Sequence, residues 1–288
     1  MLVSIIVPSL REKLLDGLLH SIERGAEGVA HEIIVISPFS PKGKSTVWLK
    51  EEVPQGTCHA IARGYEAASG DIVVLLSDDV LVTPGWLRHV VEFIVARERS
   101  HFPFVAGQNK SGGYFGTVYG RYYPYYPAIS RESAQAVGGL FSREFVSHFG
   151  DPDLGLRVWH SGGRAELCYP SKLIFASIER YFGAAPKKAA TVDADFETFK
   201  AKWSPVYGLG WGTSFREVNR DYPLASLIDG SYASPVPPTD IYVEPTHHEW
   251  LDAPLLRKAG TYVAEHASAS TIASITKLTQ TLRALSRR

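Results

Sequence analysis

The chain has 288 residues, of which 45% are hydrophobic and 21% are charged, enough for one large α/β domain or for one domain with a substantial appendage. This composition excludes collagen-like, coiled-coil and disordered chains. The 30 basic and 30 acidic residues cancel to a formal net charge of zero. That balance argues against nucleic acid as a partner, because proteins that neutralise phosphates normally carry a basic excess.

Short apolar runs alternate with helix-like stretches through the first hundred residues. Strands are predicted at 3–7, 33–36, 46–49 and 72–76. Helices are predicted at 11–24, 57–69 and 84–97. Continuous apolar runs are typical of strands buried on both faces, and helices between them indicate right-handed βαβ units. The pattern predicts an α/β fold with a mostly parallel, Rossmann-like sheet flanked by helices.

The second half of the chain is less regular. Residues 107–127 are rich in glycine and tyrosine, and we expect a long loop or hairpin that either packs on the protein or stacks on a base or sugar ring. Helices are predicted at 138–141 and 151–160, and strands at 164–168 and 172–176. Many prolines after about residue 184 divide the chain into a domain, 1–184, and a C-terminal helical and irregular extension, 185–288.

The two cysteines and the segments at the two ends of the chain indicate where in the cell the protein is expected. Cys58 and Cys168 lie far apart in apolar segments, as expected of buried, reduced thiols in a cytoplasmic protein. The first residues do not resemble a signal peptide, and no apolar run has membrane-spanning length. Residues 268–288 predict a basic amphipathic helix. We favour docking of this helix on the protein or on a partner subunit of a homo-oligomer over peripheral contact with the inner face of a membrane.

The sharpest chemical signal is a pair of carboxylates, Asp78 and Asp79, directly after the apolar strand 72–76. In an open parallel sheet, ligands bind at the carboxyl ends of the strands. Carboxylates there suit Mg²⁺ or Mn²⁺, which in turn neutralises a diphosphate. Taken alone, an Asp-Asp pair is more often a turn or a helix cap.

The surrounding motifs favour the metal interpretation, because in order they resemble those of family 2 glycosyltransferases of the rhamnosyltransferase-like kind. Ser77-Asp78-Asp79 stands at the family's Asp-x-Asp signature. The other matching segments are Val3-Ser4-Ile5-Ile6-Val7-Pro8, 32–36, 56–71, Gly138-Gly139-Leu140-Phe141 and Asp151-Pro152-Asp153-Leu154-Gly155-Leu156-Arg157. The resemblance covers about residues 1–180 and implies one GT-A domain that uses a nucleoside-diphosphate sugar.

The resemblance also implies roles for individual residues. Asp79 would bind the metal, Asp78 would contact ribose, sugar or a metal-bound water, and Asp151 would be the general base. The further positions assigned to substrate or nucleotide binding are Pro8, Ser9, Ser37, Arg63, Gly139, Asp153 and Arg157.

The chain departs from the family pattern at three places. Ser37 stands where an aspartate usually reads the nucleobase, and Gly150 stands where a glutamate commonly precedes the base. Residues 170–180 lack the histidine that many members use as a metal ligand. His247-His248-Glu249 could supply that ligand, although an ordinary surface pair is the more frequent meaning of such a sequence.

These features predict an inverting, metal-dependent glycosyltransferase acting on a hydroxyl acceptor, such as a lipid-linked glycan, in polysaccharide or glycan synthesis. A UDP-sugar is the favoured donor on family frequency alone. One alternative is a catalytically degenerate GT-A domain that binds nucleotide or glycan. A second is a sugar-nucleotide pyrophosphorylase, which is disfavoured because no glycine occurs between Pro8 and Gly17, where such enzymes carry a glycine-rich phosphate loop.

Overall fold

The computed structural model of the chain describes residues 1–26, 28–42, 46–110, 114–119, 121–175, 189–207 and 216–219. The predicted helix at 268–288 and the His247-His248-Glu249 segment lie outside these residues. No helix within the described ranges is long and apolar enough to span a lipid bilayer.

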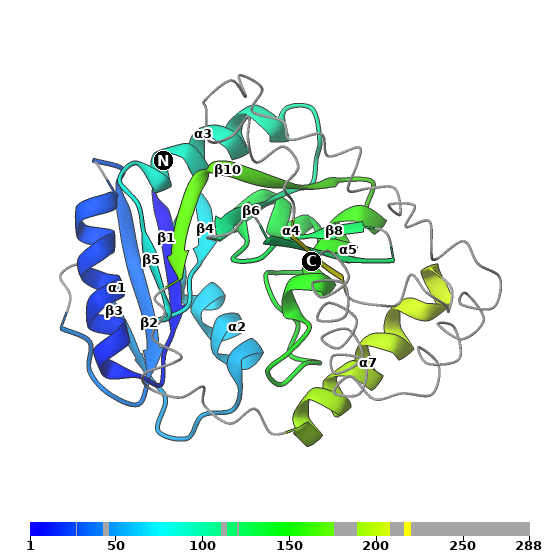
Figure 1. The fold of residues 1–288 in the computed structure, drawn as a ribbon, viewed down its shortest axis with the longest axis horizontal. Helices are drawn as coiled ribbons and strands as arrows, with labels where there is room; N and C mark the ends of the chain where they lie inside the picture. The colour runs from blue at the N-terminus through cyan, green and yellow to red at the C-terminus, as the bar shows by residue number, and fades with distance from the viewer. Residues whose placement is uncertain are drawn as a thin grey trace, which may run out of the picture.

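The first half consists of βα units, as predicted from the spacing of its apolar residues (Figure 1). The helices are α1 (Glu12–Gly25), α2 (Thr57–Ala67), α3 (Trp86–Glu98), α4 (Arg131–Ala136), α5 (Gly150–His160) and α7 (Ala189–Tyr207). The strands are β1 (Val3–Pro8), β2 (His31–Ser37), β3 (Thr46–Lys50), β4 (Ile72–Leu75), β5 (Val80–Val82), β6 (Phe104–Lys110), β7 (Tyr114–Val118), β8 (Arg121–Tyr123), β9 (Ala128–Ser130), β10 (Arg164–Phe175) and β11 (Arg216–Asn219).

Within the described residues, the main sheet has eight strands in the order β3-β2-β1-β4-β9-β6-β10-β5. β3, β2, β1 and β4 are parallel neighbours, and β10 is parallel to β6. β9 and β5 run antiparallel to their neighbours. The predicted α/β fold with a mostly parallel sheet is therefore confirmed.

Side chains that alternate along β1 supply the two hydrophobic cores on either face of the sheet. Ile5 and Val7 belong to a core with buried residues of α1 and α3. Ile6 belongs to the other, with residues of α2, α5 and α7. Figure 1 shows α1 and α2 on opposite sides of the central strands. Burying both faces explains why β1, β2 and β4 read as continuous apolar runs.

The tyrosine-rich segment forms a second, antiparallel sheet in the order β11-β7-β8. Tyr122 and Tyr123 on β8 are 3% and 6% exposed and join the core shared with α2 and α5. β7 and β8 thus form a hairpin packed on the protein, while stacking of this segment on a base or sugar ring stays a prediction.

Two local predictions were wrong. Residues 138–141 form a turn and bends instead of a helix, because Gly138 and Gly139 have φ values of +82° and +103°, outside the helical region. The two strands predicted around Pro170 are one strand, β10, with a shift in register between Cys168 and Lys172. Proline has no N–H for the strand ladder, so an irregularity there is expected.

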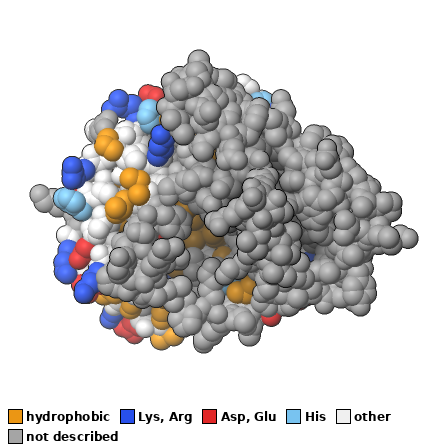
Figure 2. Space-filling model, viewed as in Figure 1, with side chains coloured by type: hydrophobic (Ala, Val, Ile, Leu, Met, Phe, Trp, Pro, Cys, Tyr) orange, Lys and Arg blue, Asp and Glu red, His pale blue; other side chains and the backbone are white. Residues whose placement is uncertain are grey.

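The helix α7 lies within the predicted extension, 185–288, yet it packs on the body of the domain. Phe199 and Trp203 are 0% and 4% exposed and belong to the same core as α2 and α5. Across the described surface beside α1, Figure 2 shows acidic and basic side chains interspersed, in keeping with the balanced net charge.

Candidate functional site

The ends of three parallel strands bring the Asp78–Asp79 pair beside the residues that follow β1 and β2. The Leu76 N–H donates to Ile6 O at 3.0 Å, and the Ser9 N–H donates to Ile36 O at 2.9 Å. These bonds continue the sheet beyond β4 and β1, so Ser9, Ser37 and Asp78 lie at the ends of neighbouring strands. Such an edge of a parallel sheet is where ligands bind in open α/β folds.

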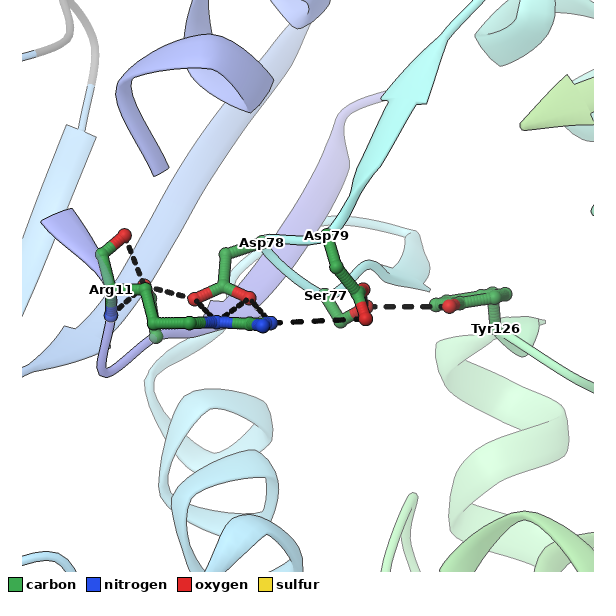
Figure 3. A network of polar contacts seen from close by, with 6 residues as sticks. Arg11, Ser77, Asp78, Asp79 and Tyr126 are labelled. Atoms are coloured by element: carbon green, nitrogen blue, oxygen red, sulfur yellow. Dashed lines mark hydrogen bonds and ion pairs between the residues drawn. The ribbon is translucent and has the colours of Figure 1, made fainter. Parts of the chain in front are cut away.

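Asp78 is held by two groups from the segment after β1 (Figure 3). The Ser9 hydroxyl donates to Asp78 Oδ2 at 2.6 Å. Arg11 Nε lies 3.1 Å from Asp78 Oδ1, and Arg11 Nη2 also donates to that oxygen. Both Asp78 oxygens therefore accept strong hydrogen bonds, consistent with a carboxylate side chain that is only 5% exposed.

Asp79 is the more open member of the pair, with its side chain 14% exposed. Its Oδ1 accepts a hydrogen bond from the Ser77 hydroxyl, which lies 3.4 Å from the Tyr126 hydroxyl. Its Oδ2 lies 3.8 Å from Arg11 Nη2. The arginine side chain runs past Asp78 and ends near Asp79, as Figure 3 shows.

Ser37 is the last residue of β2, and Arg63, in α2, reaches the end of β3, where its Nη2 donates to Lys50 O at 3.3 Å. The Ser37 side chain is fully buried, and its hydroxyl donates to Phe39 O. The Glu51 N–H donates to Ser37 O at 3.0 Å, and the Glu51 carboxylate, 6% exposed, lies 3.8 Å from Arg63 Nη1. Ser37 and Arg63 are thereby linked through Glu51, a residue that the sequence analysis did not single out.

Gly139, Asp153 and Arg157 form a second cluster. Arg157 Nη1 donates to Gly139 O at 2.7 Å, and its Nε donates to Asp153 Oδ2 at 2.8 Å. The other Asp153 oxygen accepts from Trp203 Nε1 at 3.0 Å and lies 3.0 Å from Lys202 Nζ. Asp153 is fully buried. These contacts fix the turn at residues 137–140 and join α5 to α7, while a substrate-binding role for the three residues stays a prediction.

Asp151 lies in the first turn of α5, close to the start of α2. Burial raises the pKa of the Cys58 thiol in α2, and the negative charge of Asp151 raises it further. The Cys58 N–H donates to Val146 O at 3.1 Å, in the loop that leads to α5. Three successive N–H groups of that loop, from residues 146–148, each donate to the Asp195 carboxylate at 2.9 Å.

The carboxylates present fit a metal that is held jointly with phosphate. Within the described parts of the chain, no group of three His, Cys, Asp or Glu residues is placed to bind a metal. Mg²⁺, however, usually keeps several waters and binds through one or two carboxylates together with substrate phosphates. Asp79, the more exposed of the pair, suits that mode, and Asp78 is the adjacent second oxygen donor.

Comparison with known proteins supports the family resemblance. Residues 4–140 match glycosyl transferase family 2, whereas no curated protein sequence matches the chain. Among solved structures, that of GalNAc-T7 with UDP, GalNAc and Mn²⁺ has a TM-score of 0.53 at 14% identity; the match covers 74% of this chain and 50% of that one. This chain therefore spans half the length of that enzyme.

A second solved structure is the mannosyltransferase PcManGT from Pyrobaculum calidifontis in complex with GDP-Man and Mn²⁺. Its TM-score is 0.52 at 14% identity, and the match covers 97% of this chain and 79% of that one. Likeness at this identity concerns the fold, which agrees with the GT-A architecture expected from the motifs. Residues 4–140, which include β1, β4 and the Asp78–Asp79 pair, match glycosyl transferase family 2, so the resemblance stated from the motifs is confirmed over that segment.

Proposed function

We propose that the protein transfers a sugar, with inversion, from a nucleoside-diphosphate donor to a hydroxyl acceptor. The observation that carries this proposal is the Asp78–Asp79 pair at the carboxyl end of β4, joined to Ser9 by a 2.6 Å hydrogen bond inside the segment that matches the family. A pair of carboxylates attracts a cation, and a divalent metal bound there in turn holds the diphosphate at the ligand-binding edge of the sheet.

Two structurally similar glycosyltransferases support the donor class. One was solved with UDP and Mn²⁺ and the other with GDP-Man and Mn²⁺. A divalent metal and a UDP- or GDP-sugar are therefore the first ligands to test, with UDP retained as the favoured donor. In the proposal, Pro8, Ser9, Ser37 and Arg63 line the nucleotide side. Pro8 and Ser9 stand at the end of β1 and Ser37 at the end of β2, and the Arg63 side chain reaches the end of β3 from α2.

The proposed chemistry divides between the two carboxylate clusters. Asp79 holds the metal, which when bound stabilises negative charge on the departing diphosphate. Asp78 contacts the ribose, the sugar or a metal-bound water. Asp151 accepts the proton of the acceptor hydroxyl as its oxygen attacks the anomeric carbon. Arg157 keeps the turn around Gly139 in shape beside the acceptor.

Glycan or polysaccharide synthesis, with a hydroxyl acceptor such as a lipid-linked glycan, completes the proposed role. The extension, 185–288, would then serve acceptor or partner contacts. The packing of α7 on the core supports the view that at least residues 189–207 act as part of the catalytic body.

The test is titration calorimetry of nucleoside diphosphates with Mn²⁺ and with EDTA. We expect tighter binding with Mn²⁺. Asp79→Asn should weaken nucleotide binding with Mn²⁺ about tenfold or more without unfolding the protein, because Asp79 lies after a strand end and outside the core. Asp16→Asn on α1, an exposed acid that pairs with Lys42 at 3.6 Å, is the matched control. Equal affinity for wild type in both buffers would contradict the metal role.

The packing around Gly150 bears on the alternative that the domain binds nucleotide or glycan without catalysis. A Cβ atom at Gly150 would lie 2.3 Å from the Phe141 ring, so the glutamate found at this place in the family does not fit here without movement. The departure at Gly150 is therefore part of how this fold is packed. Release of free sugar from the donor, measured with the purified protein, would exclude a purely binding domain.

A further inference from the structure

Arg11 occupies a position between the two carboxylates of the proposed donor site. It lies directly before α1, and its N–H donates to Ser9 Oγ at 3.2 Å. Since Ser9 also donates to Asp78, the three residues form a closed set of contacts. The serine hydroxyl and the arginine side chain both donate to the aspartate, and the arginine backbone N–H donates to the serine. Arg11 is consequently held in place through both its backbone N–H and its guanidinium.

The charges at this place do not cancel. Asp78 and Asp79 carry two negative charges, and Arg11 is the cation paired with them in the part of the chain that the structure describes. The side chains of Asp78, Asp79 and Arg11 are 5%, 14% and 27% exposed, so water screens them incompletely. The guanidinium stays protonated at every working pH, so its compensation is permanent.

We propose that Arg11 is a built-in counter-cation of the donor site, which takes over part of the role that a divalent metal would play there. This inference rests on the proposed function. In the protein without metal, Arg11 neutralises one charge of the Asp78–Asp79 pair. When a nucleoside diphosphate binds, the Arg11 guanidinium donates hydrogen bonds to the phosphate oxygens, because its planar N–H donors match their geometry.

Two measurable consequences follow from this position. Part of the affinity for a nucleoside diphosphate is independent of metal, because a positive charge is already present beside the phosphate site. The affinity for free metal is low, because Mn²⁺ meets a pair with net charge −1 instead of −2, and both Asp78 oxygens already accept hydrogen bonds. Metal therefore binds well only together with the diphosphate, through the more open Asp79.

The experiment compares wild type with Arg11→Gln, Arg11→Lys and Arg143→Gln. Arg143 pairs with exposed Glu66 at 2.7 Å, so its replacement removes the same charge and the same kind of contact away from the site. The first measurement is calorimetry of UDP and of GDP in EDTA. The second is electron paramagnetic resonance titration of Mn²⁺ without nucleotide. Circular dichroism checks that each variant is folded.

In EDTA we expect Arg11→Gln to bind the nucleoside diphosphate at least about tenfold more weakly than wild type, the loss typical of one charge-assisted contact. Arg11→Lys should lie between the two, because it keeps the charge and loses the planar donors. In the Mn²⁺ titration, Arg11→Gln should bind the metal about tenfold more tightly than wild type. Arg143→Gln should match wild type in both measurements.

The inference is overturned if Arg11→Gln equals wild type in EDTA, or if its affinity for free Mn²⁺ is unchanged or lower. Wild type alone also tests it: binding with Mn²⁺ but none in EDTA would refute the role of Arg11 while leaving the proposed function intact. That measurement decides the matter even if Arg11→Gln does not fold. If wild type binds neither nucleotide in either buffer, the proposed function fails and this inference fails with it.

Discussion

Replacing Asp195 by alanine tests how α7 contributes to the proposed catalytic site. Asp195 is 2% exposed and accepts hydrogen bonds from the N–H groups of residues 146–148, each at 2.9 Å. A hydrogen bond to a charged acceptor contributes about 1.5–3 kcal/mol, and a buried donor left without a partner costs a similar amount. If all three bonds were lost without replacement, the free energy of unfolding would fall by more than about 4 kcal/mol. Because part of the loop can regain water, we expect a loss of about 3 kcal/mol in the free energy of unfolding.

The assay is urea unfolding followed by circular dichroism, with Glu197→Gln as the control. Glu197 lies on the same helix, is 62% exposed and pairs only loosely with Lys200 at 3.3 Å, so we expect a change within about 0.5 kcal/mol. Sugar transfer should fall in Asp195→Ala even where the protein stays folded, because the loop leads directly to α5 and Asp151. A loss below about 1 kcal/mol would refute the reasoning, since it would mean that the loop holds its shape without Asp195.

Two further predictions concern the thiols and the proposed general base. Burial raises the pKa of Cys168 to about 12, so neither Cys168 nor buried Cys58 should react with Ellman's reagent at pH 8 until the protein is unfolded. Because the ordinary pKa of the thiol is 9.0, the contribution of Cys168 to stability is complete below pH 9 and declines as the pH rises toward 12. Cys168→Ala should reduce this decline of stability with pH. Asp151→Asn should stay folded and bind donor normally, and the rate of sugar transfer should fall about 10²- to 10⁴-fold, as measured by product formation.

The sequence predicted the first half of the fold well because its signals are local. An apolar run of four to six residues indicates a buried strand by itself, and the spacing of leucines in residues 11–24 indicates a helix by itself. The Asp78–Asp79 pair was predictable for the same reason, since it follows the most apolar of these runs.

Contacts between distant parts of the chain were not predictable in this way. Arg11 and Asp78 are 67 positions apart, and Asp195 lies 47 to 49 positions from the N–H groups it binds. No spacing rule links such residues, because the fold alone brings them together. The same limit applies to β9, whose three residues, Ala128–Ser130, are too few to show a period and gain their place from pairing with β4 and β6.

The structure also places the two aspartates in the first turn of α5, Asp151 and Asp153, in different surroundings. From the sequence alone, the general base could be chosen between them only by family position. Residues two apart on a helix point about 200° apart, so Asp151 and Asp153 face opposite sides. Asp153 faces α7, where it is fully buried against Lys202 and Trp203. Asp153→Asn should therefore cost about 3 kcal/mol of stability, as expected when one partner of a buried ion pair loses its charge. Asp151→Asn, at a partly exposed position, should change stability by less than about 1 kcal/mol and reduce sugar transfer. If Asp153→Asn instead leaves stability unchanged and abolishes transfer, the general base is Asp153 and the assignment to Asp151 is wrong.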